Sequence, residues 1–394
     1  MINRKLFWLY GLSASIYFTQ GIEGLPGQAL FNYFKNTLNL TPERVMILGS
    51  WISLVWWIKP FAGHIIDNFF TRRIWIWVSL FLSIISSLIL GNYTLPLFGL
   101  VMLLFLSSSY TAFRDVSVDG IMCVEGKKHQ ITGKIQSIQW NSIYLAGLLI
   151  GVIGGYISQN LSYKVGFLLL IPIYVVVGLI TYFYKEEKIE KSHYSIKNLF
   201  RDLKILFKNK TLMITSWFIF LYNFSPDFSV KFGYIIRDNF KWSEQFIGNL
   251  TTISALFTIL GAVLYYKWST KINIPKCLFI SVLLGAITTL CYLYYTPITA
   301  IIYRTLFVSI GTFIFMMLLD FMAQNTINGL ESTSFALLCS VTNFTSFINA
   351  RTGAYLLPKI GLVPLIIISS FTSFLCLPLI NKLKIGDSNA LPNK

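Results

Sequence analysis

Charged residues are scarce in this chain of 394 residues, and acidic residues are the scarcest of them. Only 12% of the side chains are charged, and 16 Asp and Glu stand against 32 Lys and Arg. A soluble domain carries about 25% charged residues. The composition therefore excludes an ordinary soluble protein.

Cysteine pairs and catalytic motifs are also missing. The 5 cysteines are scattered and show no Cys-x-x-Cys spacing, so neither a disulfide framework nor a zinc site is indicated. The sequence lacks a helical HExxH, a Walker motif and a GxSxG element. We therefore expect no enzyme activity, no catalytic residues, no metal ligands and no cofactor.

Apolar residues make up 55% of the chain, and the mean hydropathy is +0.65. Apolar runs of about 18 residues or more recur along the whole length, and each can cross a membrane as a helix. The first run has no small-residue cleavage site, so we interpret it as a membrane helix and not as a signal peptide. The pattern predicts an all-α membrane protein with twelve transmembrane helices: 6–30, 45–66, 74–91, 95–120, 135–158, 164–184, 212–235, 245–267, 275–296, 298–320, 334–356 and 362–382.

The Lys-rich stretch 185–211 is the widest polar gap, and it predicts a cytoplasmic loop between two domains, 1–184 and 212–394. The two halves resemble each other weakly. The segments that align are KNTLNLTPE (35–43) with RDNFKWSE (237–244), and VDGIM (118–122) with LDFMA (319–323). Two pseudo-symmetric six-helix bundles joined by a basic loop are typical of a major facilitator-type protein.

The net charge is +16, and the positions of the basic residues along the chain are more informative than the size of the charge. With the N-terminus inside, the cytoplasmic segments hold roughly three times as many Lys and Arg as the outer segments, as the positive-inside rule requires. We therefore expect both termini in the cytoplasm and a multi-pass protein of the cell membrane or an organelle. Because the basic residues lie in short loops, no nucleic-acid partner is expected.

The stretch WWIKPFAGHIIDNFFTRR (56–73) resembles the motif that major facilitator proteins carry between their second and third helices. Gly63 and Asp67 match its first positions, and Arg72 and Arg73 match its paired basic positions. Two residues between them depart from the motif: Asn68 and Phe70.

This resemblance implies a cytoplasmic latch that closes when the cavity opens outward. Asp67 and Arg73 would meet an acid of the fourth helix, either Asp115 or Asp119. The alternative is that Arg72 and Arg73 only anchor the helix at the lipid headgroups. In either case, these residues are expected at the cytoplasmic side.

Lys59 lies about two turns inside the same helix, where an unpaired lysine costs about 3 kcal/mol. Its ammonium can bind an anion in a cavity or reach back toward the interface. Trp56 precedes it and Pro60 follows it, and a proline loosens the helix and frees backbone groups that need water or neighbours. We expect Lys59 and Trp56 to face a substrate cavity.

The fourth helix carries a second charged group. Asp115 and Asp119 are four residues apart and share a helix face, whereas Arg114 points elsewhere. Two like charges on one face suit proton carriage. An ion pair with Lys59 or Arg73 that only holds helices together is the other interpretation, and the two are compatible.

Two stretches rich in helix-breaking residues contain acids. Glu23 lies in QGIEGLPGQ (20–28), and Asp227 lies in NFSPDFSVKF (223–232). A break at membrane depth exposes backbone polar groups, which is a pointer to a binding site. Both acids are therefore candidates for substrate contact.

Two further features are interpreted as structural. Arg304 and Arg351 lie near the outer ends of their helices, which favours anchoring at the membrane interface. Gly147, Gly151 and Gly155 recur every four residues, a period that lets helices approach closely.

Several segments together resemble the folate–biopterin transporter family, a branch of the major facilitator superfamily. The segments are YFTQGIEGLPGQALFNYF (17–34), WWIKPFAGHIID (56–67), RDVSVDGIMCVEG (114–126), SPDFSVKFGYIIRDNFKWSEQFIGNL (225–250), LGAVLYYKW (260–268), NGLESTSFALLCSVTN (328–343) and GAYLLPKIG (353–361). The resemblance implies proton-driven uptake of folates or pterins across a lipid bilayer. A monomer is expected.

A folate needs aromatic faces for its ring, a carboxylate at the ring edge and basic groups for its tail. The residues expected in these roles are Trp56, Trp57, Trp140 and Tyr144 for the faces, Lys59 and Arg114 for the charge, Glu23 or Asp227 for the ring, and Asp115 and Asp119 for protons or gating. Another small amphipathic solute, such as a nucleoside, sugar or peptide fragment, is the main alternative. A non-transporting receptor is less well supported, because it does not need buried charges.

Overall fold

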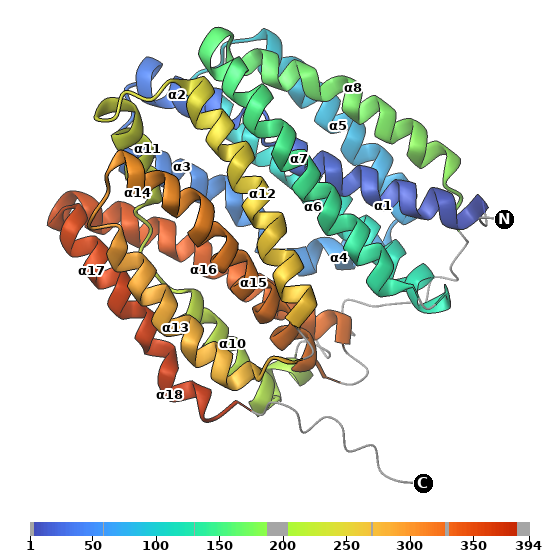
Figure 1. Ribbon diagram of the computed structural model, residues 1–394. Coiled ribbons are helices and arrows are strands. Elements are labelled where there is room, and N and C mark those ends of the chain that lie inside the picture. Colours follow the sequence, from blue (N-terminus) through green and yellow to red (C-terminus); the bar gives the residue numbers. More distant parts are fainter. Residues whose placement is uncertain are drawn as a thin grey trace. The chain divides into compact units, whose positions relative to one another are not determined.

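The computed structural model describes residues 4–57, 59–129, 131–186, 204–268, 271–327 and 331–383. Helices dominate these segments and no strand occurs among them, which confirms the predicted all-α class (Figure 1). The elements are α1 (Arg4–Ile22), α2 (Gly27–Asn32), η1 (Tyr33–Thr37), α3 (Pro42–Ser53), η2 (Leu54–Trp56), α4 (Lys59–Asn68), α5 (Arg72–Asn92), α6 (Leu97–His129), α7 (Thr132–Asn160), α8 (Tyr163–Phe183), α10 (Lys210–Asn223), α11 (Ser229–Asp238), α12 (Glu244–Trp268), α13 (Ile274–Cys291), α14 (Pro297–Ile302), η4 (Tyr303–Phe307), α15 (Val308–Gln324), α16 (Glu331–Ile360), α17 (Leu362–Thr372), η5 (Ser373–Cys376) and α18 (Leu377–Ile380).

Within the described segments, 7 helices are long and apolar enough to cross a membrane. They are Arg72–Asn92, Leu97–Gly126, Lys134–Asn160, Tyr163–Phe183, Glu244–Trp268, Pro297–Gln324 and Leu362–Ile380. Several other expected spans consist of more than one element: 6–30 contains α1 and α2, 45–66 contains α3, η2 and α4, and 212–235 contains α10 and α11. The breaks in the first and the last of these agree with the helix-breaking stretches predicted from the sequence. Pro26 and Pro226 lie in two of these interruptions, where proline removes a backbone donor.

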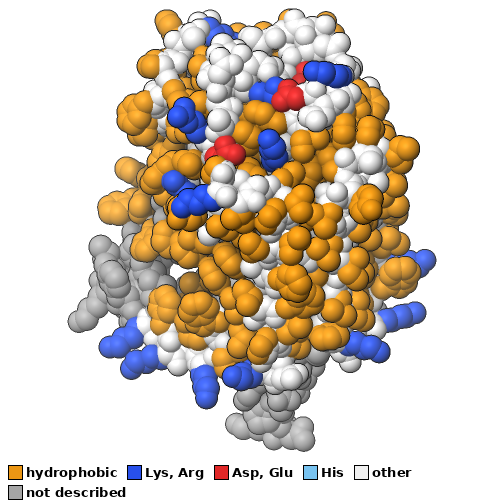
Figure 2. Space-filling model, turned by 90° about the vertical axis from the view of Figure 1, so that its left-hand side faces the viewer, with side chains coloured by type: hydrophobic (Ala, Val, Ile, Leu, Met, Phe, Trp, Pro, Cys, Tyr) orange, Lys and Arg blue, Asp and Glu red, His pale blue; other side chains and the backbone are white. Residues whose placement is uncertain are grey.

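The surface of the helices is apolar over large areas. Figure 2 shows one face, on which hydrophobic side chains cover most of the area. Large side chains such as Phe98 and Phe371 are 78% and 65% exposed. A water-soluble protein rarely exposes continuous apolar surface on this scale, so these faces suit contact with lipid tails.

Residue contacts divide the chain into two compact units. Unit 1 comprises Met1–Leu40, Phe61–Tyr194 and Trp242–Leu256, and unit 2 comprises Thr41–Pro60, Ser195–Lys241 and Phe257–Lys394. Each unit contains segments from both halves of the sequence. The division into domains 1–184 and 212–394 stays a prediction, and most of the loop between them, 187–203, lies outside the described residues.

Glycines allow the helices of unit 1 to approach closely. A Cβ on Gly21 of α1 would lie 2.6 Å from Ala146 Cβ of α7, and a Cβ on Gly155 would lie 2.9 Å from Gly248 Cα of α12. Beside the second contact, the hydroxyl of Thr252 donates to the Leu148 carbonyl at 2.9 Å. The prediction that the glycines of the fifth expected helix serve close packing is confirmed.

Unit 2 has a core of large apolar side chains from α10, α13, α15 and α16. Phe218 and Phe321 are fully buried in it, with ring centroids 5.6 Å apart in an edge-to-face arrangement. In the same unit α3 packs along α16. These contacts hold α10 and α16 beside the break between α10 and α11, where the cavity described below lies.

We expect Gly248→Ala to lower the thermal unfolding midpoint of the protein. Its Cβ would come within 2.3 Å of the Gly151 carbonyl oxygen, so α7 and α12 would have to separate. Gly285→Ala in α13 is the control, because no heavy atom lies within 4 Å of the added Cβ. That variant should keep or slightly raise the midpoint, since alanine favours a helix by roughly 0.5–1 kcal/mol. Equal midpoints for the two variants would contradict the close-packing interpretation.

Candidate functional site

The helix break at QGIEGLPGQ places Glu23 at a corner inside unit 1. α1 ends at Ile22, and the backbone then turns through short bonds, from the Gly24 N–H to the Gly21 carbonyl and from the Leu25 N–H to the Ile22 carbonyl. α2 begins at Gly27. The predicted break is confirmed, and it leaves the Glu23 side chain directed at α6 and α8.

Glu23 and Arg114 form an ion pair at the centre of a group that we call the charge cluster: Glu23, Ser83, Thr111, Arg114 and Tyr174. Arg114 is completely buried and donates to a Glu23 carboxylate oxygen and, at 3.2 Å, to the Ser83 hydroxyl. The hydroxyls of Thr111 and Tyr174 donate to Glu23 at 2.7 and 3.0 Å. The Tyr174 ring centroid lies 5.6 Å from Arg114 Cζ.

The charge cluster neutralises two charges that apolar surroundings would otherwise penalise. Each carboxylate oxygen of Glu23 accepts at least one hydrogen bond, whereas Arg114 Nε is buried without a partner among the described residues. A buried pair of this kind is costly to break, because the remaining charge is left uncompensated. It can nevertheless be opened by a proton on the carboxylate or by a competing anion on the guanidinium.

The acids of the fourth expected helix lie further along α6. Asp119 accepts the Tyr17 hydroxyl at 2.6 Å and the Gln139 amide at 3.4 Å, and Asp115 is buried. At the aligned position of the second half, Asp320 of α15 likewise accepts a tyrosine hydroxyl at 2.7 Å and a glutamine amide at 3.2 Å. The two aligned acids therefore accept the same kinds of donor, which lie on α1 and α7 in the first half and on α12 and α15 in the second.

The paired arginines of the motif at 56–73 have separate contacts. The Arg73 guanidinium donates to the carbonyls of Thr181 and Tyr182 at the end of α8, at 3.0 and 2.7 Å. Arg72 packs against Gly120 of α6, where a Cβ would lie 2.4 Å from Arg72 Nε. The side chain of Asp67 lies outside the described residues. The latch stays a prediction, and Arg73 here also satisfies carbonyls at a helix C-terminus.

Four further predicted substrate residues form two pairs, one of a lysine with a tryptophan and one of two aromatic rings. Lys59 Nζ lies 4.3 Å from the Trp56 ring centroid in unit 2. The Trp140 and Tyr144 rings of α7, in unit 1, have centroids 6.1 Å apart. Both pairs are partly exposed. A cation over an aromatic face, as at Lys59, gains from the ring quadrupole.

In unit 2 the break between α10 and α11 is held by α16. The Asn349 side chain donates to the Asn223 carbonyl at 2.8 Å and accepts the Ser225 N–H at 3.0 Å. The backbone carbonyl of Asn349 accepts the Asp227 N–H at 2.9 Å. One turn further along, Gly353 lets the Asp227 backbone approach so closely that a Cβ would lie 1.9 Å from its carbonyl oxygen. The free backbone groups of this break therefore find partners inside the protein.

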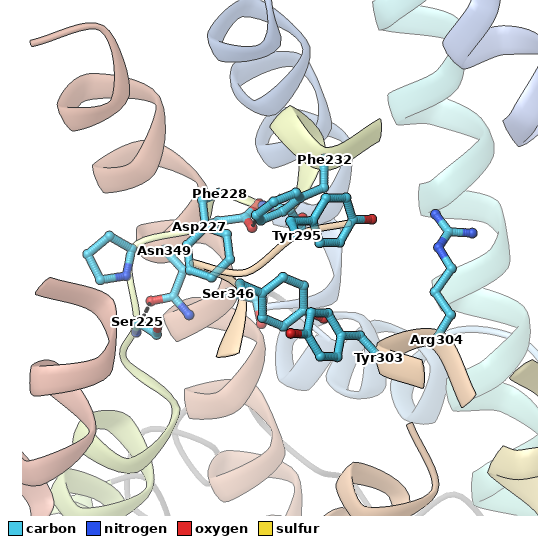
Figure 3. A pocket seen from close by; sticks show the side chains of 12 residues that line it. Ser225, Asp227, Phe228, Phe232, Tyr295, Tyr303, Arg304, Ser346 and Asn349 are labelled. Carbon is cyan, nitrogen blue, oxygen red and sulfur yellow. Dashed lines mark hydrogen bonds between the residues drawn. The ribbon is translucent and has the colours of Figure 1, made fainter. Parts of the chain in front are cut away.

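A cavity of about 520 Å³ lies beside this break, entirely within unit 2. Aromatic residues from α11, the α13–α14 connection and the π-helix η4 form much of its wall (Figure 3). The lining residues are Ser225, Pro226, Asp227, Phe228, Ser229, Phe232, Tyr292, Tyr295, Tyr303, Arg304, Ser346 and Asn349. Short π-helical insertions often occur at functional sites.

Of this wall, the sequence predicted only Asp227 as a substrate residue. Arg304 was expected to anchor its helix, and the structure places it on the cavity wall. The other arginine of that prediction, Arg351, has its guanidinium 4.6 Å from the Trp51 ring centroid. Clustered tyrosines in YLYYTP (292–297) were the available signal for the aromatic wall.

The charge cluster generates a stability prediction. Arg114→Gln should lower the free energy of unfolding by about 3 kcal/mol, because it removes one member of a buried ion pair. The double variant Glu23→Gln with Arg114→Gln should recover part of this loss, since two neutral side chains leave no unpaired charge. Thermal midpoints of the two single variants and the double variant provide the measurement. Additive losses would show that the pair is not energetically coupled.

The sequence profile of the BT1 family matches residues 20–385 of this chain. Two curated relatives match this chain over most of their own length. A folate-biopterin transporter of Synechocystis sp. is 23% identical over 405 residues, which covers 95% of this chain and 81% of the relative. Folate transporter 1 of Plasmodium falciparum is 25% identical over 360 residues, which covers 86% of this chain and 70% of the relative.

Solved structures share the fold. The crystal structure of the nucleoside transporter NupG matches with a TM-score of 0.74 and 14% identity, and the match covers 98% of this chain and 100% of that chain. The D-xylose–proton symporter matches with a TM-score of 0.74 and 13% identity, covering 95% and 97%. The chain has the major facilitator fold, and it belongs to the BT1 family.

Proposed function

We propose that this multi-pass membrane protein is a secondary active transporter that carries folates or pterins by alternating access. Membership of the BT1 family over residues 20–385 carries the proposal, together with relatives named as folate or folate-biopterin transporters. The major facilitator fold is compatible with alternating access, in which rigid bundles rock around a fixed site.

We further propose that protons drive the transport through the charge cluster. The attraction between Glu23 and Arg114 requires an ionised carboxylate, so a proton on Glu23 frees the guanidinium. The guanidinium of Arg114 can then donate two parallel hydrogen bonds to another anionic group. Because each event makes the other more favourable, proton binding and anion binding are coupled.

Gating at the cytoplasmic end is assigned to the motif at 56–73 and the acids of α6. Arg72 packs on Gly120, the neighbour of Asp119, so a small shift between α5 and α6 changes the surroundings of this acid. We retain Asp67 and Arg73 as latch partners, with Asp115 or Asp119 as the acid. Both termini are placed in the cytoplasm on the distribution of basic residues, and a monomer is the expected unit of function.

A thermal-shift screen tests the substrate class. Folic acid and biopterin should raise the unfolding midpoint of the purified protein, because a ligand of the folded state stabilises it by mass action. At a concentration of 100 times Kd the gain is about 2.7 kcal/mol. Uridine and xylose serve as comparison ligands and should leave the midpoint unchanged. A shift with uridine or xylose alone would replace the proposed substrate class with that of the binder.

Proton coupling is tested with Glu23→Gln in proteoliposomes. The variant should still exchange labelled folic acid between the two sides, whereas accumulation driven by a pH gradient should be lost. Exchange and accumulation should respond differently because glutamine resembles the protonated carboxyl but cannot release a proton. Glu43→Gln, an acid at the start of α3 outside the charge cluster, should behave as wild type. Gradient-driven accumulation by Glu23→Gln at the wild-type level would exclude Glu23 as the coupling group.

A further inference from the structure

We propose that the cavity of unit 2 holds the fused ring of a folate or pterin, with Asp227 at the donor edge of the ring and Arg304 toward the carboxylate tail. This assignment rests on the proposed function, because it places the two ends of that function's substrate on two sides of one cavity. Asp227 was expected near the ring from the sequence, and the structure adds that Arg304 lines the same cavity.

The aromatic wall suits a flat ring. Phe232 and Tyr295 have ring centroids 4.1 Å apart, and Tyr292 and Tyr303 have centroids 4.8 Å apart. The Tyr303 hydroxyl donates to the Cys291 carbonyl at 2.6 Å, which fixes its ring against the end of α13. A wall that is already ordered costs little conformational entropy when a ligand stacks on it. The cavity volume also falls in the range of roughly 300–1,000 Å³ typical of ligand pockets.

Asp227 has acceptor capacity left for a ligand. One carboxylate oxygen, Oδ1, accepts the N–H of Ser229, the first residue of α11, at 2.8 Å. Among the described residues no hydrogen bond reaches the other oxygen, Oδ2. The pterin ring presents an amino group and a neighbouring ring N–H on one edge, and both are donors that a carboxylate accepts. The backbone contacts to Asn349 hold the carboxylate in place.

Arg304 lies on the opposite side of the aromatic residues from Asp227 (Figure 3). The Tyr295 hydroxyl points toward the side on which Arg304 lies. A guanidinium and a hydroxyl make this end of the cavity attractive to an anion. A folate carries carboxylates on its tail, whereas biopterin carries none.

Because the two charges lie at opposite ends of the cavity, substitutions of Arg304 and Asp227 should affect the binding of the two ligands differently. Arg304→Gln should weaken the binding of folic acid by about tenfold or more, because a hydrogen bond to a charged group is lost. It should change the binding of biopterin by less than about twofold, since that ligand has no carboxylate to lose. Asp227→Asn should weaken both ligands by about tenfold, because one of the two acceptors at the ring edge becomes a donor.

The experiment is equilibrium binding of folic acid and biopterin to the purified full-length protein. Arg351→Gln is the matched control, because Arg351 is a partly buried arginine of unit 2 that stacks on Trp51 and does not line the cavity. Asp227→Asn keeps an oxygen that can accept the Ser229 N–H, so the start of α11 is preserved. Thermal midpoints of all variants confirm folding before binding is measured.

The results of these binding experiments test the cavity assignment and the proposed function separately. Selective loss of folic acid binding in Arg304→Gln, with loss of both ligands in Asp227→Asn, supports the proposal. Wild-type affinity in both variants overturns the cavity assignment and leaves the proposed function intact. Equal loss of both ligands in Arg304→Gln overturns the placement of the tail. If the wild-type protein binds neither ligand, the proposed function fails, and the inference fails with it.

Discussion

Satisfying polar groups inside an apolar helix bundle is the constraint on which the rest of this structure depends. Water is not available at membrane depth, so every exposed backbone group and charge needs a partner within the protein. Two breaks meet this demand in different ways. At the first, tight turns close the backbone and Glu23 receives Arg114 as its counter-ion. At the second, the Asn349 side chain bridges Asn223 and Ser225.

These two solutions give the sites different chemistry. The charge cluster of unit 1 is closed, since its charges neutralise each other and the hydroxyls of Thr111 and Tyr174 both donate to the Glu23 carboxylate. Such a group responds to a proton or to an anion that replaces one partner. The cavity of unit 2 is open, with a carboxylate and a guanidinium held apart by aromatic rings. Such a group receives a ligand that is flat in the middle and polar at both ends.

Small residues let the helices pack closely, and this packing stabilises a chain that has few charged residues. Gly248 approaches the Gly151 carbonyl, and Gly353 approaches Asp227, so backbones touch where larger side chains would keep them apart. In lipid, helices gain little from hiding apolar surface from one another, and van der Waals contact between such residues replaces that gain. The large apolar side chains are consequently free to face outward.

The sequence by itself determined the all-α membrane class, the two helix breaks with their acids, and the close packing around Gly151 and Gly155, because these depend on local composition and periodicity. It did not show that Arg114 pairs with Glu23, that Arg73 contacts the end of α8, or that Arg304 lies on a cavity wall. The first two contacts are between residues 91 and 108 positions apart in the sequence. The position of Arg304 depends on how its helix is rotated about its own axis. The tertiary structure decided all three, because only the packing of helices selects which of several possible partners a buried charge meets.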